Sequence, residues 1–275
     1  MSSGQVLING EPGTSLPVSD RGLAFGDGIF ETVLIRHGRP ILLERHLARL
    51  NRGLNTLSIA LEESLVSDDV ETILIRETPV DAVLKILCTR GQGGRGYRSA
   101  AGLSPTRILS LHPLPPALPS EGIKAFLCRQ TVGHQPALAG IKHLNRLEQV
   151  LASQEWPDDS FHEGLMFDAA GFVIEGTRSN VLVSTDGHWL TPNLDKGGIA
   201  GVMREHLLDL WGGRLQVANI DLPMLRNADE ICFCNSVTGV MPVRLLRDYD
   251  HKELVYFPGA LCAAAQQAFQ DLISA

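Results

Sequence analysis

The sequence feature that most constrains the fold is a proline-rich stretch near the middle of the chain, "HPLPPALPSEG" at residues 112–122. Four prolines in so short a stretch are typical of a stiff, extended connection. At 275 residues the chain is also longer than most single domains. We therefore predict a small N-terminal domain over residues 1–111, a linker over residues 112–122 and a larger C-terminal domain over residues 123–275.

Hydrophobic periodicity on both sides of this linker predicts an α+β protein. In the N-terminal part, residues 42–57 and 61–77 carry the repeat of amphipathic helices, and short apolar runs predict strands, the first of which ends in an Asn-Gly turn. In the C-terminal part, two β-hairpins are predicted, with turns at residues 169–171 and 186–187. Residues 201–212 and 257–274 are predicted to be helices, with a strand over residues 230–236 between them.

Composition excludes several classes of partner. The net charge of −7 and a pI of about 5.7 argue against nucleic acid as the main partner, although a local basic pocket for a small anion is compatible with them. No apolar run approaches the roughly 20 residues of a membrane span, and "MSSGQVLING" lacks the basic and apolar regions of a signal peptide. We therefore expect a cytoplasmic protein that binds neither nucleic acid nor a membrane.

The cysteines give no sign of a metal site. A zinc site needs ligands that converge from several places, and no pair of histidine and cysteine residues has that spacing. We expect reduced, buried core cysteines and no metal. The five cysteines are Cys88, Cys128, Cys232, Cys234 and Cys262.

Among the five lysines, Lys142 has the most unusual sequence context. It follows a loop of small residues in "AGIKHLNRLEQVLA", and apolar residues recur behind it at helical spacing. We therefore expect Lys142 to open a helix that buries one face through Leu144, Leu147, Val150 and Leu151. A helix N-terminus lowers the pKa of an amine, as a Schiff-base lysine requires. Spacing alone, however, favours a lysine with no catalytic role.

Several motifs in a fixed order resemble a known enzyme family. "FGDGIFET", "RGQGGRGY", "IKHLNRLEQVLA", "EGTRSN" and "GVMRE" are similar to segments of the fold-type IV pyridoxal-phosphate enzymes. The resemblance extends from "VLING" at residue 6 to "VMPV" at residues 240–243, which is nearly the whole chain. This family includes branched-chain aminotransferases, D-amino acid aminotransferases and aminodeoxychorismate lyases. The segment around Lys142 and the glycine-rich loop most resemble the lyases.

The resemblance implies a site for pyridoxal 5′-phosphate (PLP). It assigns Lys142 as the amine that binds the cofactor aldehyde and Glu175 as the carboxylate that faces the pyridine nitrogen. The backbone amides of Val202 and Met203, at a predicted helix N-terminus, would bind the phosphate. Without the resemblance, Glu175 would be interpreted as a surface acid.

Three further residues complete the phosphate site that the resemblance implies. Ser236 and Val237 match a second phosphate contact, and Arg49 in "HLARL" matches an arginine that reaches the phosphate from the small domain. From the sequence pattern alone, Arg49 would be a residue on a solvated helix face. Aminotransferases commonly have threonine at the position of Met203, so this departure favours the lyases.

The substrate site is implied in the same way. Arg95 and Tyr97, in the loop "RGQGGRGY", match residues that bind substrate carboxylates, and Phe30 and Thr32 match pocket-lining residues on one face of a strand. The loop reaches the partner subunit's site in this family, which implies a homodimer. The alternative for this loop is a flexible surface hairpin. Leu34 stands where branched-chain aminotransferases have arginine.

The activity implied is a lyase reaction that converts 4-amino-4-deoxychorismate to 4-aminobenzoate and pyruvate for folate synthesis. Two alternatives are kept. One is a branched-chain or D-amino acid aminotransferase, which would begin with the same proton abstraction at Lys142. The other is a non-catalytic relative, which the presence of both Lys142 and Glu175 disfavours.

Overall fold

The chain forms two compact units in a computed structural model that describes residues 5–274. Unit 1 runs to Leu114 and also takes in Ile141–Asn145, whereas unit 2 consists of Pro115–Gly140 and the chain from Arg146 onward. The chain thus leaves unit 1 within the proline-rich stretch of residues 112–122. The predicted division into residues 1–111 and 123–275 does not include the return of Ile141–Asn145 to unit 1.

Unit 1 is built on a six-stranded sheet with the strand order β2-β1-β6-β5-β3-β4. Asn9 and Gly10 both have positive φ, as do His37 and Gly38, so each pair forms the tight turn of a hairpin. The Asn-Gly turn predicted after the first strand is therefore confirmed. The strands are β1 (Val6–Ile8), β2 (Glu11–Pro12), β3 (Gly28–Arg36), β4 (Arg39–Pro40), β5 (Ala82–Thr89) and β6 (Thr106–His112).

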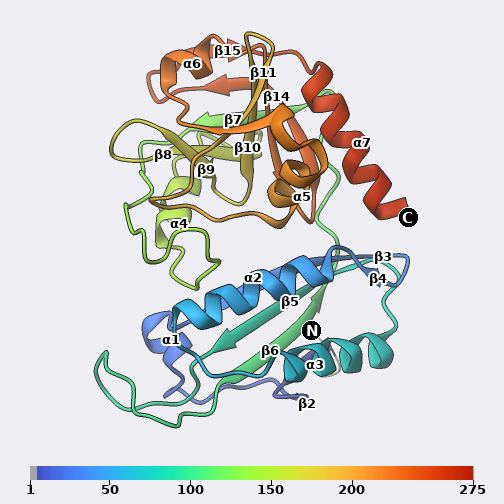
Figure 1. Cartoon of the computed structure of the whole chain (residues 1–275), viewed down its shortest axis with the longest axis vertical. Helices are drawn as coiled ribbons and strands as arrows, with labels where there is room; N and C mark the ends of the chain where they lie inside the picture. Colours follow the sequence, from blue (N-terminus) through green and yellow to red (C-terminus); the bar gives the residue numbers. More distant parts are fainter. Residues whose placement is uncertain (1–4, 275) are drawn as a thin grey trace. The chain divides into compact units, whose positions relative to one another are not determined.

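Two amphipathic helices, α2 (Leu43–Thr56) and α3 (Glu63–Glu77), pack on this sheet (Figure 1). Both confirm the predicted helices. Their apolar residues recur every three or four positions, so that one side of each helix faces the sheet. A short helix, α1 (Arg21–Phe25), precedes β3. The core between helices and sheet includes Leu47, Leu50, Leu54, Val66, Val70, Ile73, Val33, Ile35, Leu84, Ile86 and Leu109.

The segment that contains Lys142 completes the outer edge of β3. The N–H of Phe30 donates to the Lys142 carbonyl at 2.9 Å, and the N–H of Leu144 donates to the Gly28 carbonyl at 2.9 Å. β4 pairs only with Ile35 and Arg36 at the far end of β3, so this segment satisfies backbone groups that β4 does not reach. The prediction that Lys142 opens a helix is therefore wrong, because its backbone pairs with a strand.

Unit 2 is built on a nine-stranded sheet with the strand order β12-β11-β10-β13-β14-β7-β8-β9, and β15 also pairs with β14. The predicted hairpins are β8–β9 and β10–β11. Asp186 and Gly187 both have positive φ in the second turn, and Gly171 has positive φ in the first. The strands are β7 (Ile123–Leu127), β8 (Glu163–Phe167), β9 (Val173–Gly176), β10 (Asn180–Thr185), β11 (His188–Pro192), β12 (Leu215–Ala218), β13 (Glu230–Asn235), β14 (Gly239–Arg247) and β15 (Glu253–Val255).

The helices of unit 2 are α4 (Leu147–Ser153), α5 (Val202–Trp211), α6 (Leu222–Arg226) and α7 (Ala260–Ser274), with a 3-10 turn at Gly212–Arg214. The two predicted helices, α5 and α7, are confirmed. α4 differs from expectation, because Leu147, Val150 and Leu151 are 75 %, 46 % and 51 % exposed. The residues that α4 buries are Gln149 and Ala152. The predicted buried apolar face is therefore wrong.

All five cysteines are free and buried, as expected. Burial raises the pKa of the Cys88 thiol to about 12. Within residues 5–274, no group of three or more His, Cys, Asp or Glu side chains is arranged to hold a metal ion. No helix in the same range is long and apolar enough to cross a membrane.

Candidate active site

Lys142 lies in unit 1 beside the predicted substrate residues of β3. Its Nζ atom is 4.5 Å from the centroid of the Phe30 ring, and the side chain is half-buried. Phe30 and Thr32 are both half-buried, whereas the alternate residues Ile29, Glu31 and Val33 are buried. Phe30 and Thr32 therefore share the face of β3 opposite the helices, as the period-2 alternation predicts.

Arg49 belongs to a buried charged cluster on the other face of β3. Its Nε and Nη2 atoms donate to the two oxygens of Glu31 at 2.8 and 2.6 Å. His46 Nδ1 lies 2.6 Å from Glu31 Oε2, and its Nε2 atom is buried without a hydrogen-bond partner. Arg49 is only 4 % exposed, so it does not lie on a solvated helix face. Glu31 and His46 were not predicted as site residues from the sequence. The one signal for them was Glu31 itself, an acid within an apolar strand.

The charges of Glu31 and Arg49 shift the pKa values of their neighbours in this cluster. Burial raises the pKa of Glu31, but the Arg49 charge and the hydrogen bonds from Arg49 and His46 outweigh it and lower the pKa to about 2 from 4.5. Burial lowers the pKa of His46, despite the Glu31 carboxylate that raises it. His46 is therefore neutral at pH 7 and donates its Nδ1 proton to Glu31.

We expect this cluster to make unit 1 sensitive to acid. Because the pKa of Glu31 is depressed in the folded chain, its stabilisation is complete above pH 4.5 and is lost as the pH falls towards 2. The loss amounts to about 3 kcal/mol in the free energy of unfolding. Urea unfolding of the cofactor-free chain at pH 6 and pH 3 measures the part of this loss that falls above pH 3, about 2 kcal/mol.

The matched variants are Glu31→Gln and the exposed Glu62→Gln. Glu31→Gln should be less stable at pH 6, because Arg49 loses its buried counter-charge, and its stability should depend less on pH. Glu62→Gln should behave like the parent chain. A Glu31→Gln chain with unchanged acid sensitivity would contradict this account.

Glu175 is a buried carboxylate at the end of a strand in unit 2. It lies in β9, is 3 % exposed, and pairs across the hairpin with Met166. Its Oε1 atom accepts from Gln149 Nε2 at 3.0 Å, and its Oε2 atom accepts from the Ile199 N–H at 2.7 Å. Two donors on one carboxylate favour its ionised form. Glu175 is thus a buried carboxylate held by two hydrogen bonds and not a surface acid.

A second buried acid holds the turn that follows Glu175. Glu163 in β8 is fully buried and accepts from the Thr177 hydroxyl and N–H and from the Ser179 hydroxyl at 2.5, 2.9 and 2.6 Å. These bonds explain the hydroxyl residues of "EGTRSN" as anchors of the turn. Glu163 was also missed from the sequence, where it is an acid within an apolar strand.

Helix α5 begins at Val202, three residues after Ile199. Gly201 is its N-cap, and Val202 and Met203 open the helix with buried side chains. Asn180 packs against this cap: its Nδ2 atom donates to the Ile199 carbonyl at 2.8 Å, and a Cβ atom on Gly201 would lie 1.8 Å from its Oδ1 atom. Arg204 Nη2 donates to the Pro192 carbonyl at 2.8 Å and so ties the same turn to β11. The helix start is therefore held rigidly.

The turn after β13 lies next to this helix start, because Cys234 of β13 pairs with Asn180 of β10. In that turn, the N–H of Val237 already donates to Asn235 Oδ1 at 2.9 Å, and Thr238 does so at 2.8 Å. Ser236 is half-buried. A phosphate at this turn would have to share the Val237 N–H with Asn235, whereas Ser236 also offers a hydroxyl.

We expect Gly201→Ala to weaken PLP binding by about tenfold or more. The added Cβ atom would collide with Asn180 and displace the first amides of α5, and an anion depends on the direction of those amides. Titration of the cofactor-free chain with PLP, followed by absorbance, measures the change in Kd. Gly213→Ala is the control, because no atom lies within 4 Å of its Cβ position. Equal Kd values for the two variants would exclude the α5 amides as phosphate ligands.

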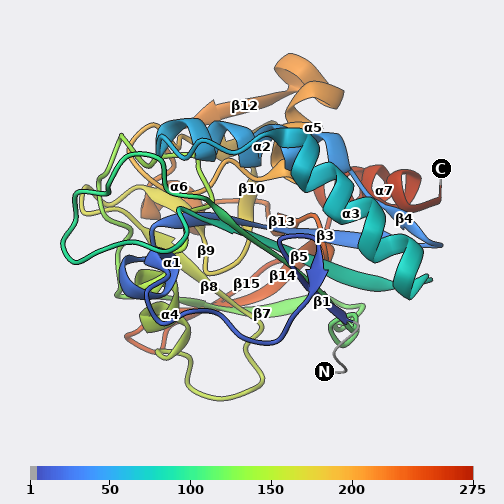
Figure 2. The same ribbon diagram turned by 90° about the horizontal axis from the view of Figure 1, so that it is seen from below.

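Arg95 and Tyr97 lie in the long connection between β5 and β6, which extends beyond the end of the unit 1 sheet (Figure 2). Both side chains are exposed, and Tyr97 is 89 % exposed. The backbone around them is nevertheless anchored, since Arg21 donates to the carbonyls of Gly96 and Tyr97. The alternative, a flexible surface hairpin, does not account for these two hydrogen bonds.

The groups that PLP requires are present in the two units. Unit 1 supplies a half-buried primary amine at Lys142 and a buried guanidinium at Arg49. Unit 2 supplies a buried carboxylate at Glu175, which accepts a hydrogen bond from the Ile199 N–H. It also supplies the backbone amides at the start of α5, which begins three residues after Ile199. An aldehyde, a phosphate and a protonated pyridine nitrogen each find a matching group in this set.

Comparison with known proteins places this chain in a family. The family model "Amino-transferase class IV" matches residues 28–246. An aminodeoxychorismate lyase from Vibrio harveyi is 35 % identical over 86 % of this chain and 89 % of its own length. A D-alanine aminotransferase from Bacillus licheniformis is 29 % identical over 98 % of this chain and 97 % of its own length.

A solved structure gives the same result for the fold. The crystal structure of 4-amino-4-deoxychorismate lyase from Pseudomonas aeruginosa superimposes with a TM-score of 0.88 at 43 % identity, over 97 % of this chain and 98 % of that one. The α+β fold is thus that of the fold-type IV enzymes, as expected. The chain belongs to the class IV aminotransferase family, and it is an enzyme of that family.

Proposed function

We propose that this chain is a PLP-dependent lyase that converts 4-amino-4-deoxychorismate to 4-aminobenzoate and pyruvate. The observation that carries the proposal is the 43 % identity to a lyase of known structure over nearly the full length of both chains. The D-alanine aminotransferase matches over a similar length at 29 %. Methionine at position 203, where aminotransferases commonly have threonine, points in the same direction.

Four parts of the chain would hold the cofactor. Lys142 Nζ would bind its aldehyde, and the Glu175 carboxylate would hold the proton on its pyridine nitrogen. The amides of Val202 and Met203 receive the phosphate, as does the turn of Ser236 and Val237. Arg49, which Glu31 holds through Nε and Nη2, would add positive charge for the phosphate.

When bound, PLP serves as an electron sink for the carbon that carries the substrate amine. Lys142 would take the proton from that carbon. The enolpyruvyl C–O bond of the ring then breaks, the six-membered ring becomes aromatic, and the leaving oxygen takes the bonding electrons. Lys142 returns the proton to the methylene carbon of enolpyruvate, which gives pyruvate. No second amino acid is consumed.

The substrate is a dicarboxylate, and the chain offers cationic and polar groups for it. We assign Arg95 and Tyr97 to its carboxylates, because a guanidinium fork and a hydroxyl suit a carboxylate. Phe30 and Thr32 lie on one face of β3, and the Phe30 ring is next to Lys142 Nζ. We assign both side chains to the pocket for the substrate ring.

We further propose that the enzyme is a cytoplasmic homodimer. The exposed side chains of Leu147, Val150 and Leu151 form an apolar stripe on α4, which supports association of two copies. Sedimentation equilibrium of the parent chain and of Leu147→Glu tests this part separately from catalysis. A parent chain that sediments as a monomer at micromolar concentration contradicts it.

One experiment tests the reaction. The purified protein is incubated with aminodeoxychorismate, which its synthase makes from chorismate and glutamine, and 4-aminobenzoate and pyruvate are quantified. The proposal requires equal amounts of both products without any added 2-oxoacid. Rapid amino exchange between an amino acid and a 2-oxoacid, with no aromatic product, would instead establish the aminotransferase alternative, which the Bacillus licheniformis relative favours.

A further inference from the structure

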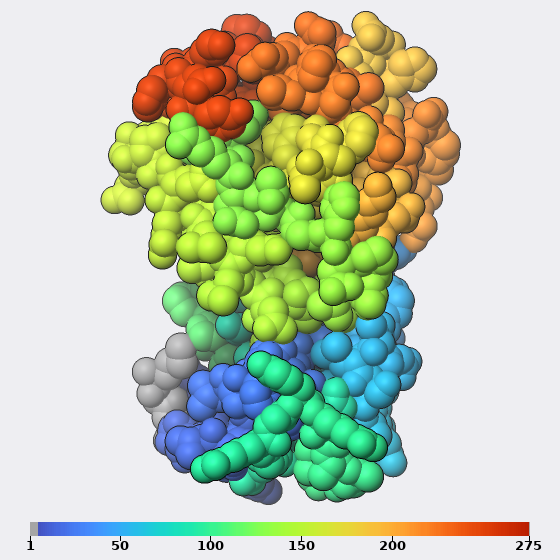
Figure 3. Space-filling model, turned by 90° about the vertical axis from the view of Figure 1, so that its left-hand side faces the viewer, coloured from blue at the N-terminus to red at the C-terminus, as the bar shows by residue number. Residues whose placement is uncertain are grey.

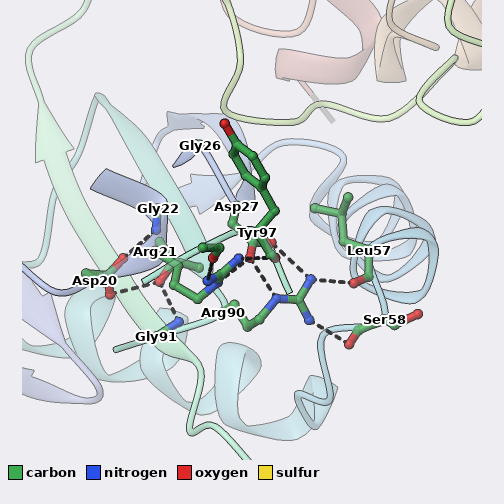
Figure 4. Close-up of polar contacts among 12 residues, drawn as sticks. Asp20, Arg21, Gly22, Gly26, Asp27, Leu57, Ser58, Arg90, Gly91 and Tyr97 are labelled. Atoms are coloured by element: carbon green, nitrogen blue, oxygen red, sulfur yellow. Dashed lines mark hydrogen bonds and ion pairs between the residues drawn. The ribbon is translucent and has the colours of Figure 1, made fainter. Parts of the chain in front are cut away.

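The glycine-rich loop of unit 1 is anchored at its base by three charged residues that the proposed chemistry does not use. Arg21 is buried, and Asp27 and Arg90 are half-buried. Arg21 lies at the start of α1 and is only 3 % exposed. Its Nη1 and Nη2 atoms donate to the carbonyls of Gly96 and Tyr97 at 3.0 and 2.7 Å (Figure 4). These two carbonyls follow Arg95 directly in the chain. Arg21 therefore fixes the backbone that directs the side chains of Arg95 and Tyr97.

Packing around Arg21 leaves little room for another position of the loop. The Cδ atom of Arg21 lies 2.6 Å from where a Cβ atom on Gly93 would be, so only glycine allows this approach. The Arg21 guanidinium also lies 4.7 Å from the centroid of the Phe25 ring, and the Tyr97 ring packs edge-on against Phe25 at 5.6 Å. The space-filling view shows the teal atoms of this part of the chain beside the dark-blue atoms that precede β3 (Figure 3).

Asp27 connects Arg21 to the rest of unit 1. Its Oδ2 atom accepts from Arg21 Nε and from Arg90 Nε, both at 2.8 Å. Arg90 also donates to the carbonyls of Leu57 and Ser58, just beyond α2, at 2.6 and 2.9 Å (Figure 4). Burial raises the pKa of Asp27, but the bonds and charges of Arg90 and Arg21 lower it overall. Asp27 is therefore ionised and bound by two arginines at neutral pH.

The residues on either side of Asp27 hold the Lys142 segment. The Gly26 carbonyl accepts from Asn145 Nδ2 at 3.1 Å, and the Gly28 carbonyl accepts from the Leu144 N–H at 2.9 Å. The same three residues, 26–28, thus connect to the chain next to Lys142 through their backbone and to the glycine-rich loop through the Asp27 side chain.

A surface loop with no task does not require two arginines and an aspartate beneath it. Removing charged groups from water, fully or in part, lowers the free energy of unfolding unless each charge is paired. This arrangement therefore sacrifices some stability but fixes the position of the loop. The side chains of Arg95 and Tyr97, which this part of the backbone carries, are exposed. Pre-organised polar groups bind a ligand without having to be ordered on binding.

We propose that Arg21 and Asp27 are positioning residues for substrate binding, which hold Arg95 and Tyr97 in the geometry that receives the substrate carboxylates. This inference rests on the proposed function. It adds two residues that do not touch the substrate and that act through the loop backbone. Loss of the anchor should therefore weaken substrate binding more than it slows the chemical step, because Lys142 and Glu175 keep their own contacts.

The test compares Arg21→Lys with a matched control, Arg36→Lys. Lysine at position 21 keeps the charge beside Asp27, but its single ammonium lacks the guanidinium fork that reaches both carbonyls and Asp27 at once. Arg36 forms an exposed ion pair with Asp81 at 2.8 Å in the same unit. For Arg21→Lys we expect KM for aminodeoxychorismate to rise about tenfold or more, with kcat within about threefold and PLP absorbance unchanged. Arg36→Lys should match the parent enzyme.

A double-mutant cycle with Arg95→Gln separates positioning from general loosening. If Arg21 acts through Arg95, Arg21→Lys should add less than twofold to KM in an Arg95→Gln background. Hydrogen exchange of residues 91–97 should be faster in Arg21→Lys than in the parent chain. An unchanged KM, or additive effects of the two substitutions, overturns the inference. A parent enzyme that makes no 4-aminobenzoate refutes the proposed function itself, and this inference with it.

Discussion

Lys142→Ala is expected to abolish 4-aminobenzoate formation, with turnover reduced by about 10⁴-fold or more. The substitution removes both the amine that binds the cofactor aldehyde and the base that moves the substrate proton, and these are two separate contributions to the rate. The variant should also lose the visible absorbance of a lysine-bound cofactor. Turnover at high enzyme concentration and a spectrum after addition of PLP measure the two effects.

The fold should tolerate this substitution, because the bonds that hold the segment to β3 are made by the backbone of Lys142 and Leu144. Lys252→Ala is the control, since Lys252 is exposed in a turn. Reduction of the parent enzyme with borohydride should attach the cofactor to the peptide that contains Lys142. Attachment to any other lysine would show that the assigned amine is wrong.

Glu175→Gln is expected to lower turnover by about 10²-fold to 10³-fold, with the fold intact. Glutamine fills the same volume and can still accept from the Ile199 N–H, but it carries no charge to retain the proton on the pyridine nitrogen. The pair with Gln149 Nε2 is kept only if the amide oxygen faces it. Steady-state kinetics and the pH dependence of the cofactor spectrum measure the effect.

Glu155→Gln provides a matched control in the same unit. Glu155 is also a carboxylate that accepts backbone N–H bonds, from Arg129 and Gln130 at 2.6 and 2.7 Å. Its substitution should change turnover by less than about threefold. If Glu175→Gln turned over as fast as Glu155→Gln, Glu175 would not be the partner of the pyridine nitrogen.

Local patterns allowed much of the fold to be predicted. Paired residues that tolerate positive φ, such as Asn9-Gly10 and Asp186-Gly187, mark hairpins because few other residues accept that backbone geometry. The two helices of unit 1 were found because their apolar positions repeat along one face that packs on the sheet. Both signals are local in the chain, so no knowledge of distant contacts is needed.

Features that depend on distant contacts were not predicted correctly. Lys142 pairs with β3, more than a hundred residues away in the chain, and because of this pairing the helix begins only at Leu147. In α4 the polar Gln149 is buried because it donates to Glu175, whereas the leucines are exposed. Likewise, Glu31 and Glu163 became interpretable only with their partners in place. The roles of all the predicted site residues stay predictions. These residues are Lys142, Glu175, Arg49, Val202, Met203, Ser236, Val237, Phe30, Thr32, Arg95 and Tyr97.

The return of Ile141–Asn145 to unit 1 has a consequence for synthesis on the ribosome. When residues 1–114 have emerged from the exit tunnel, the outer edge of β3 at Gly28 and Phe30 still lacks its partner. That edge closes only after some thirty further residues have been translated. Until then, the nascent chain exposes an open strand to chaperones and to other growing chains. A gene fragment that stops at the proline-rich stretch should accordingly yield insoluble product.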